Sequence, residues 1–582
     1  MTSEWILEKS KDGLNILKVT KNNKNIYIGS KYNQKREIDK FLMEIEYFNN
    51  DIYIIFGLAD GGYIRELIKK KKSKNRILII EYNEDLMLNF FKVEKEIDFN
   101  EIFITSDFIK IKNFLESIKS HLVDNIKIHH YLNYSKVYNS EVKATFDFMK
   151  EIVGRIIVNR NTSLRFGEEW FKTLLQNIKN GKNAIELNHY KEKFSDVPAI
   201  IVSAGPSLSN NIDYLKGFDK GLIISGGRTL RALQEKDIEA DLLCIIDSGE
   251  TSYELVKNRI SQINIPLVFN ENTNCKIVEE HKGPKVIFSG NKIVDDIWGV
   301  ELPRLVSGGS VAHSMTSLAI YLGCNPIIFI GQDLAYTNEK NHAEIAYNES
   351  DLEGELERIK NIKKSDAVYT EDINGELIRT NKVFQAFKLS FEELIERNSE
   401  IKFINATEGG ANIKGAENRK LVDVISEFRE IDIKGNIKRK VDIKQASKEI
   451  GIVLKGILKK IDDCNELCNE SILELKRMKI KYIKKIDIEK NLERLDLLDL
   501  KMKKNIREIS LLDNLTYEEI YKLEREEKYL LKADESKQIQ FTKIYEKNLK
   551  IYSIIKENLA CVKTEVEKTL IDENTNQNIN NS

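Results

Sequence analysis

The placement of proline constrains this chain of 582 residues more than any other feature of its sequence. All six prolines lie between residues 198 and 326, and none occurs on either side of that window. Proline is excluded from helix interiors and is frequent in turns. The distribution therefore predicts a turn-rich centre that is followed by a largely helical remainder.

Length and charge narrow the class of protein. At roughly 150 residues per domain, three or four domains are expected. Lys and Arg total 91 against 92 for Asp and Glu, and this balance argues against a nucleic-acid partner bound through a basic field. No run approaches about 18 apolar residues, so no membrane span is expected. The start lacks a secretory signal and the six cysteines are scattered, which predicts a cytoplasmic protein.

The first 150 residues alternate strand and helix patterns, which is typical of a parallel sheet of βαβ units. We predict an N-terminal Rossmann-like α/β domain over residues 1–150. Apolar runs predict its strands at 51–56, 76–80 and 101–105. A Gly-rich turn at 57–62 follows the first strand, and Glu81 ends the second. The spacing does not match G-x-G-x-x-G, so a degenerate nucleotide fold is favoured over a live cofactor site.

A second alternation begins near residue 197, after a helical connector predicted for 151–196. It predicts a central, doubly wound α/β domain over 197–428. The apolar runs that predict its strands are 199–203, 221–225, 241–247, 265–270, 285–289, 326–331 and 400–405.

The strand signal ends after this domain. A heptad seam predicts an all-α helical domain over 429–572, and the polar tail 573–582 is expected to be disordered. Cys464 and Cys468 are four residues apart and fall on the seam. Core packing is therefore favoured over metal binding, and no metal site is predicted.

Three turns of the central domain share one design, in which a strand ends in small residues and a helix follows. They lie at 200–208, 223–230 and 305–311. Free N–H groups at a helix N-terminus bind anions, and Arg228 adds a guanidinium that can bind phosphate or carboxylate. Because the carboxyl edge of one sheet is where α/β domains bind ligands, we predict an anion or nucleotide site there. The absence of a P-loop and of a G-x-S-x-G elbow disfavours P-loop NTPases and α/β-hydrolases.

The strand at 326–331 precedes Asp333 and His342, which are the two candidate bases. A free histidine titrates near about pH 6.5 and can accept a proton at neutral pH. The alternatives are a helix cap for Asp333 and an exposed loop histidine for His342. A later loop places Thr407 and Glu408 where they can face the same crevice.

Six segments, taken in order, resemble the motility accessory factor (Maf) glycosyltransferases, which are bacterial proteins that modify flagellin. The segments are Ala-Gly-Pro-Ser-Leu (204–208), Ser-Gly-Gly-Arg (225–228), Asp-Ser-Gly-Glu (247–250), Gly-Gly-Ser-Val-Ala (308–312), Gly-Gln-Asp-Leu-Ala (331–335) and Asn-Ala-Thr-Glu-Gly-Gly-Ala (405–411). The resemblance covers the central domain and, more loosely, the three-part layout. The family is similar in turn to sialyltransferases that use CMP-sugars.

The resemblance implies an inverting, metal-independent O-glycosyltransferase that needs no cofactor. It would transfer a pseudaminic or legionaminic type of nonulosonic acid from its CMP-sugar to Ser or Thr of flagellin, in support of flagellar assembly and motility. His342 would be the base. Asp333 stays the second catalytic candidate because of its position after the strand at 326–331, and we expect the helical C-terminus to bind flagellin. Ala204 departs from the Asn that some sialyltransferases have there. The donor-binding residues implied are Gly205, Pro206, Ser207, Ser225, Gly226, Gly227, Arg228, Asp247, Ser307, Gly308, Gly309, Ser310, Gln332, Thr407, Glu408 and Gly409.

Two other functions stay open at this point. A related archaeal family, the MptE-like hydroxymethylpterin pyrophosphokinases, shares this central domain and diphosphorylates a pterin. A relict nucleotide fold would instead make the chain a flagellin-binding chaperone without catalysis. The heptad seam also allows oligomerisation, and the sequence predicts no particular oligomeric state.

Overall fold

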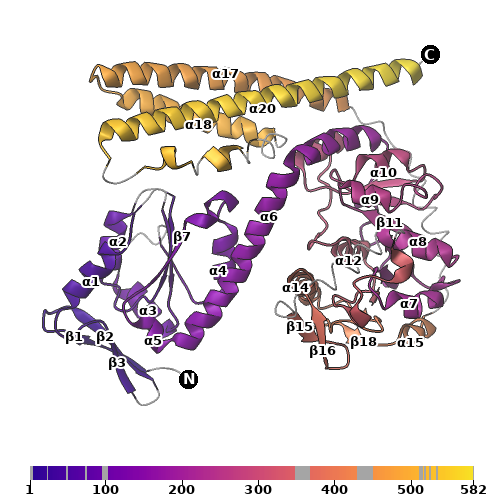
Figure 1. Ribbon diagram of the computed structural model, residues 1–582, viewed down its shortest axis with the longest axis horizontal. Helices are drawn as coiled ribbons and strands as arrows, with labels where there is room; N and C mark the ends of the chain where they lie inside the picture. The colour runs from indigo at the N-terminus through magenta and orange to yellow at the C-terminus, as the bar shows by residue number, and fades with distance from the viewer. Residues whose placement is uncertain are drawn as a thin grey trace. The chain divides into compact units, whose positions relative to one another are not determined.

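The computed structural model of the protein describes residues 4–21, 24–47, 50–71, 75–94, 102–347, 368–428, 450–509, 516, 519–523, 526–531 and 535–580. The chain forms two compact units (Figure 1). The first unit comprises Met1–Gly167 and Tyr517–Lys547, and the second comprises Glu168–Thr516 and Asn548–Ser582. Among the described residues, no helix has the length and apolar character needed to cross a membrane.

The first unit is built on a parallel sheet of four strands in the order β6-β5-β4-β7. Its strands are β4 Ile52–Phe56, β5 Arg76–Ile80, β6 Ile102–Ile104 and β7 Ile126–His130. A three-stranded antiparallel sheet precedes it, formed by β1 Glu4–Lys9, β2 Asn15–Lys21 and β3 Lys24–Ile28. The helical elements are α1 Gln34–Met43, α2 Ile64–Lys70, α3 Glu84–Val93, α4 Phe108–Glu116, η1 Ser120–Asn125, α5 Tyr134–Val137 and η7 Glu527–Tyr529, with α6 Asn139–Asn180 running into the second unit.

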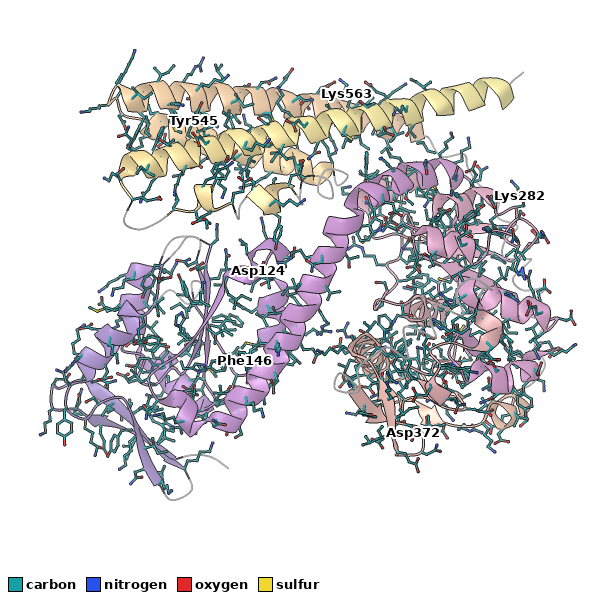
Figure 2. All side chains as sticks on the ribbon, in the orientation of Figure 1. Asp124, Phe146, Lys282, Asp372, Tyr545 and Lys563 are labelled. Atoms are coloured by element: carbon teal, nitrogen blue, oxygen red, sulfur yellow. The ribbon has the colours of Figure 1, made fainter. Side chains whose placement is uncertain are left out.

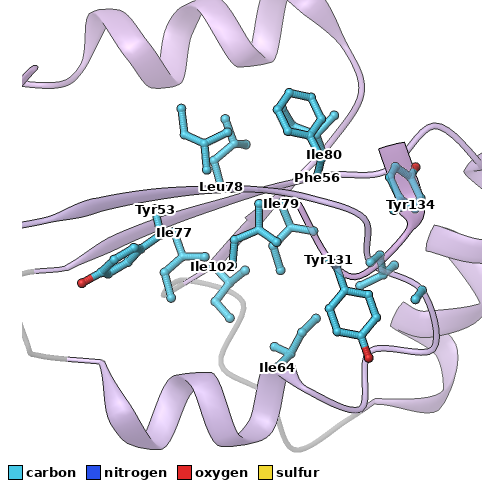
Figure 3. Packing of buried hydrophobic residues seen from close by; sticks show 14 of the residues in the cluster. Tyr53, Phe56, Ile64, Ile77, Leu78, Ile79, Ile80, Ile102, Tyr131 and Tyr134 are labelled. Carbon is cyan, nitrogen blue, oxygen red and sulfur yellow. The ribbon is translucent and has the colours of Figure 1, made fainter. Parts of the chain in front are cut away.

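The two central strands of this four-stranded sheet, β4 and β5, are buried on both faces, which explains why they are continuous apolar runs. Figure 3 shows Leu78 and Ile80 on one face of β5 and Ile77 and Ile79 on the other, with a helix beyond each face. All four side chains are at most 1% exposed. Three strands of the sheet match the predicted ranges, whereas β7 and the antiparallel sheet were not predicted.

The second unit contains a parallel sheet of nine strands, in the order β18-β17-β14-β9-β10-β11-β12-β13-β8. The strands are β8 Ile185–Glu186, β9 Ala199–Val202, β10 Leu222–Gly226, β11 Leu242–Ile245, β12 Leu267–Phe269, β13 Lys285–Ile287, β14 Ile327–Ile330, β17 Phe403–Asn405 and β18 Glu417–Asn418. The chain moves outward from β9 to β13, then returns to lie at the other side of β9. This reversal confirms the doubly wound α/β fold, and each of the seven predicted strands is present.

Helices and a small hairpin complete this region. The helical elements are η2 Leu187–Tyr190, α7 Leu208–Asn211, η3 Ile212–Leu215, α8 Gly227–Glu235, α9 Glu250–Glu254, α10 Cys275–Glu280, α11 Lys292–Trp298, α12 Val311–Leu322, η4 Thr337–Glu339, η5 Glu344–Ala346, α14 Lys382–Glu396 and α15 Leu421–Ser426. The hairpin is β15 Val368–Glu371 and β16 Leu377–Thr380, and Asp372, labelled in Figure 2, accepts hydrogen bonds from the backbone of its turn.

Long helices follow, namely α17 Ile450–Ile483, α18 Glu489–Glu508 and α20 Lys537–Asn580 (Figure 1). The predicted heptad seam of α17 is buried along its length, with Cys468 Sγ 3.7 Å from Met502 Sδ of α18. Tyr552 of α20 donates a 2.5 Å hydrogen bond to Asp499 of α18. Burial raises the pKa of the Cys468 thiol to about 12, which is expected of a packed core cysteine.

The range 429–572, predicted as one C-terminal domain, is divided between the two units of the structure. Tyr517–Lys547 groups with the first unit, because Tyr521 donates to Asp124 at 3.3 Å and its ring lies 4.9 Å from the Arg160 guanidinium. The range 429–449 lies outside the described residues. Helix α20 runs to Asn580 and so passes through most of the range 573–582 that was predicted to be disordered. That polar run contains no proline or glycine to stop a helix.

Candidate functional site

The candidate site lies where the central sheet reverses its direction of winding. β9 pairs with β10 on one side and with β14 on the other, all in parallel. The turns after these three strands therefore meet at one edge of the sheet. Helix α12 begins at the same edge, since a methyl group at Gly226 would lie 3.3 Å from Val311 Cγ1. The structure thus brings the three predicted turns together at the switch point, where α/β sheets bind ligands.

The Gly-Pro-Ser turn after β9 is occupied by a carboxylate of the chain itself. Asp333 is buried, and its oxygens accept from the Ser207 N–H at 3.2 and 3.3 Å, the Ser207 hydroxyl at 2.7 Å and the Thr337 hydroxyl at 2.6 Å. The N–H of Gly205 donates to Gly331 O at 2.7 Å, and Pro206 has none. The structure therefore places an internal anion where the sequence predicted a donor phosphate.

Gly205 is required by this arrangement, because a methyl group there would lie 2.2 Å from Asp333 Oδ1. Burial raises the pKa of Asp333, while the hydrogen bonds from Thr337 and Ser207 act in the opposite direction. The geometry matches the helix-cap alternative more closely than that of a free base. Asp333 caps α7, although the two are far apart in the chain.

The loop at 405–411 closes over Asp333 from the other side. Ala411 N donates to Asp333 O at 2.7 Å, and a methyl group at Gly410 would lie 2.4 Å from Asp333 Cα. The buried Thr407 accepts from Gln332 N at 3.3 Å. Glu408 and Gly409 are half-buried in the same loop. These residues are brought to the crevice edge, and most of their contacts support the Asp333 turn.

Gln332 links the ends of two neighbouring strands at the switch point. Its Oε1 accepts a 2.5 Å hydrogen bond from Ser203, the residue that follows β9. Gln332 itself follows Gly331 at the end of β14, and it is buried. The amide therefore fixes the spacing between the two strand ends at the switch point.

The turn after β10 presents a different group. Ser225 is fully buried, and its hydroxyl is hydrogen-bonded to Gly226 O at 3.0 Å and Thr229 Oγ1 at 2.9 Å. Thr229, which the sequence analysis did not identify, also accepts from the Gly226 N–H at 3.2 Å. Ser225 thus stabilises the turn and is not turned towards a ligand. Gly227 begins α8, and Arg228 follows in its first turn.

Arg228 carries the clearest sign of a ligand site. The side chain is half-buried, and its Nη1 atom is buried without a hydrogen-bond partner. A buried N–H group of a guanidinium is costly without a partner, since it has lost its water and gained no acceptor. An anion bound at the N-terminus of α8 would satisfy it, with the helix dipole acting in the same direction.

The third turn, 307–310, depends on left-handed glycines. Gly308 has φ +48° and Gly309 has φ +84°, and methyl groups there would lie 2.4 Å from the His313 ring and 2.7 Å from the Phe387 ring. Ser310 caps α12 by accepting from Ala312 N at 3.3 Å. Ser307 is exposed at the start of the turn. The N-terminus of this 12-residue helix therefore faces the same edge as Arg228.

His342 lies against both the β9 turn and α8. Its ring is hydrogen-bonded to the Ala204 carbonyl, which also accepts from Ala343 N at 2.9 Å. The ring contacts Tyr347 edge-on, with centroids 5.7 Å apart, and is half-buried. Burial, together with the charge of Arg228, lowers the pKa of His342 to about 3. His342 is thus a neutral imidazole at physiological pH, and it is not the exposed loop histidine of the alternative interpretation.

Asp247 stands one strand further along, after β11. Its side chain is exposed, yet protein surrounds it closely enough that desolvation raises the pKa of its carboxyl. Its carbonyl accepts from Asn274 N at 2.9 Å. In the part of the chain that the structure describes, no group of three or more His, Cys, Asp or Glu side chains could hold a metal ion.

The Gly-rich turn of the first unit, by contrast, is filled by protein. Glu81 is fully buried and accepts from Leu58 N and Asn83 N at 3.0 Å each and from the Tyr134 hydroxyl at 2.8 Å. A methyl group at Gly57 would lie 2.7 Å from the Tyr134 ring. The residue at the spacing of a ribose ligand is therefore used to hold the turn.

Comparisons with known proteins agree with this architecture. A family model described as 6-hydroxymethylpterin diphosphokinase MptE-like matches residues 172–339. No curated protein matches the sequence. A solved structure of a MAf glycosyltransferase from Magnetospirillum magneticum AMB-1 is similar, with a TM-score of 0.62 and 14% identity over 99% of this chain and 95% of that chain. The resemblance to the Maf proteins is thereby confirmed at the level of the fold.

Proposed function

We propose that this chain is a glycosyltransferase that binds a nucleotide-activated, anionic sugar at the carboxyl edge of the nine-stranded sheet. The observation that carries the proposal is the buried, unpartnered Nη1 of Arg228 beside the neutral imidazole of His342. The Arg228 guanidinium can bind an anion, and the His342 imidazole can accept a proton. The shared fold with a MAf glycosyltransferase, over nearly the whole chain, supports the same function.

The donor we favour is a CMP-linked nonulosonic acid of pseudaminic or legionaminic type. Such a donor carries a phosphate and a sugar carboxylate, so it needs two positive anchors. Arg228 and the N-terminus of α12 supply two at this edge. We infer the specific donor from the resemblance of the six motifs to the Maf proteins, and the two anchors suit the two anionic groups of that donor.

The transfer we propose is a direct displacement with inversion. His342 takes the proton from an acceptor hydroxyl, and the hydroxyl oxygen forms a bond to the anomeric carbon. The bond from that carbon to the phosphate oxygen breaks, and its electron pair leaves with CMP. Arg228 stabilises the charge on the departing phosphate, which is where such preorganised donors act most strongly. With positive charge supplied in this way, the step requires no metal.

One hydrogen bond of the ring suits His342 for this role. One ring nitrogen is hydrogen-bonded to the Ala204 carbonyl, so in the neutral ring the other is the acceptor. Asp333 acts one layer further out, since its carboxylate holds Ser207 and Thr337 and has no free oxygen for the substrate. We therefore assign Asp333 as a positioning residue rather than a base.

Flagellin is the acceptor that we propose, and its Ser or Thr hydroxyls would be modified in the cytoplasm. The experiment is a transfer assay with the full chain, flagellin and a CMP-nonulosonic acid, read by intact mass. We expect a mass increase of one sugar residue with the wild type and its loss with His342→Ala. The matched control is His189→Ala, because His189 is a surface histidine paired with Glu186. A chain that neither binds the donor nor shifts the mass of flagellin overturns the proposal.

The family-model match favours a second candidate function. The model spans five of the six motif segments and belongs to a diphosphokinase-like domain. Under this alternative the anchors would hold ATP, and a hydroxymethylpterin would receive a diphosphoryl group. Incubation with both substrates would then release AMP. AMP release without any sugar transfer selects this function over the glycosyltransferase.

A further inference from the structure

Arg228 and His342 are held together by two separate parts of the fold. Arg228 lies in the first turn of α8, whereas His342 lies in the segment that follows β14. Arg231 of α8 donates from Nη1 to Tyr347 O at 3.0 Å, and Ala343 N donates to Ala204 O at 2.9 Å. These two hydrogen bonds fasten the histidine segment to α8 and to the β9 turn. The pair is therefore a fixed feature of the site.

The other charged groups around Arg228 and His342 have partners of their own. On α8, Arg231 forms an ion pair with Glu235 at 2.6 Å. On the histidine segment, Lys340 is paired with Glu344. At the β9 turn, the Asp333 carboxylate is taken up by Ser207 and Thr337. Among the described residues, Arg228 is the charge that acts on His342.

We propose that Arg228 makes His342 a donor-gated base, so that the imidazole becomes able to take a proton only when an anion of the donor sits on Arg228. In the free protein the unpaired guanidinium opposes an imidazolium beside it. A phosphate or carboxylate on Arg228 cancels that charge and itself favours the imidazolium. This inference rests on the proposed function, because the anion belongs to the sugar donor.

The chemical consequence follows from how general bases work. A base is most effective when its pKa lies near the working pH, and His342 in the free protein lies far below that range, at about 3. An opposite charge within about 4–6 Å moves a pKa by about 1–3. Donor binding would thus bring His342 towards its useful range. The acceptor hydroxyl would then be activated only in a site that already holds the donor.

The test is a pH titration of the histidine ring signals by NMR in the full chain, with and without CMP, the leaving group. The signal that disappears in His342→Gln identifies the residue. We expect CMP to raise the measured pKa of His342 by about 1–3. Arg228→Gln should raise it without CMP and abolish the response to CMP, whereas Arg228→Lys should keep the charge and part of the response. Arg397→Gln removes a surface arginine and should change neither value.

Two results overturn the inference. One is a His342 pKa that does not move when CMP is bound, and the other is a His342 pKa that Arg228→Gln leaves unchanged. The titration of His342 in Arg228→Gln needs no ligand. It therefore tests whether Arg228 acts on His342 even if the donor is not a CMP-sugar. Loss of CMP binding and of sugar transfer in the wild type would count against the proposed function, and the Arg228→Gln titration would still count for or against the pair.

Discussion

The two parallel sheets of this chain share a plan and differ in what stands at the carboxyl ends of their strands. In each, a Gly-rich turn follows a central strand, and a carboxylate of the chain accepts N–H groups of that turn. Glu81 does so in the first unit and Asp333 in the second. The second sheet adds, at Arg228, a buried Nη1 atom without a hydrogen-bond partner, beside the neutral ring of His342. In the second sheet it is therefore the turn after β10, which carries Arg228, that suggests a binding site. The Gly-rich turn after β9 does not, because Asp333 occupies it.

The largest expected effect is on the rate of sugar transfer, which should depend on a residue of the second sheet and not on one of the first. His342→Ala should lower the rate of sugar transfer by about 10²–10⁴-fold, because general base catalysis contributes about that much. Tyr134→Phe removes a hydrogen bond to Glu81 in the first unit and should leave the rate per folded molecule unchanged. Steady-state transfer assays at matched folded concentration check both. A comparable loss from Tyr134→Phe would break the comparison.

The next effect concerns the two internal carboxylates. Asp333→Ala should lower the free energy of unfolding by about 3 kcal/mol, since each buried donor left without an acceptor costs about 1–3 kcal/mol. It should also slow sugar transfer, because the β9 turn carries the carbonyl that orients His342. Glu81→Ala should destabilise its own unit alone. Chemical denaturation and transfer assays distinguish them, with the exposed Asp219→Ala as the control. Full transfer activity in a folded Asp333→Ala protein would remove Asp333 from the site.

A smaller effect tests how tightly each turn is packed. Gly61 and Gly13 both have positive φ, at +74° and +84°, so alanine strains the backbone at both. A methyl group at Gly61 would lie 2.1 Å from the Phe90 ring, whereas a methyl group at Gly13 would have no neighbouring atom within 4 Å. Gly61→Ala should therefore cost about 1–3 kcal/mol more than Gly13→Ala in urea denaturation. Equal costs would mean that the turn has room for a ligand after all.

The smallest effect is a pH dependence of the first unit. Burial raises the pKa of Glu81 to about 7 in the folded chain, above its ordinary value of 4.5. Between these values the folded state holds the proton that the unfolded state has lost, so stability falls as the pH rises. The slope should not exceed about 1.4 kcal/mol per pH unit. Hydrogen exchange at the Leu58 amide, from pH 5 to about 7, should follow it after correction for intrinsic exchange. Glu81→Gln should remove the dependence.

The sequence predicted the fold well, because buried parallel strands are apolar runs that are easy to recognise. It missed β8 and β18, which are two residues long and carry too little pattern. It also missed the antiparallel β1–β3 sheet, where charged residues interrupt the alternation. Whether such short or partly polar segments form strands depends on the residues that pack against them in space, and a local sequence pattern does not contain that information.

The arrangement of the candidate site was predicted only in part, because many of its contacts join residues that are far apart in the chain. The small-residue turns meet at one edge of the sheet, as the sequence predicted, and Arg228 and His342 are at that edge. A helix cap was one of the roles predicted for Asp333, but the helix that it caps was not foreseeable, because its partner Ser207 is 126 residues away in the chain. Thr337 and Thr229 were missed as well, since a hydroxyl that stabilises a turn leaves no distinctive spacing. Single-sequence reasoning finds the groups that stand out chemically and overlooks those that hold them in place.

The carboxylate inside the β9 turn also bears on which anions this edge of the sheet would select. An open Gly-Pro-Ser turn would attract a small free anion, because free N–H groups at a helix N-terminus bind anions. Asp333 already accepts the Ser207 N–H, so that group is not available to a ligand. Under the proposed function an anion would instead be held by Arg228 and the N-terminus of α12, an arrangement that favours a ligand large enough to reach both.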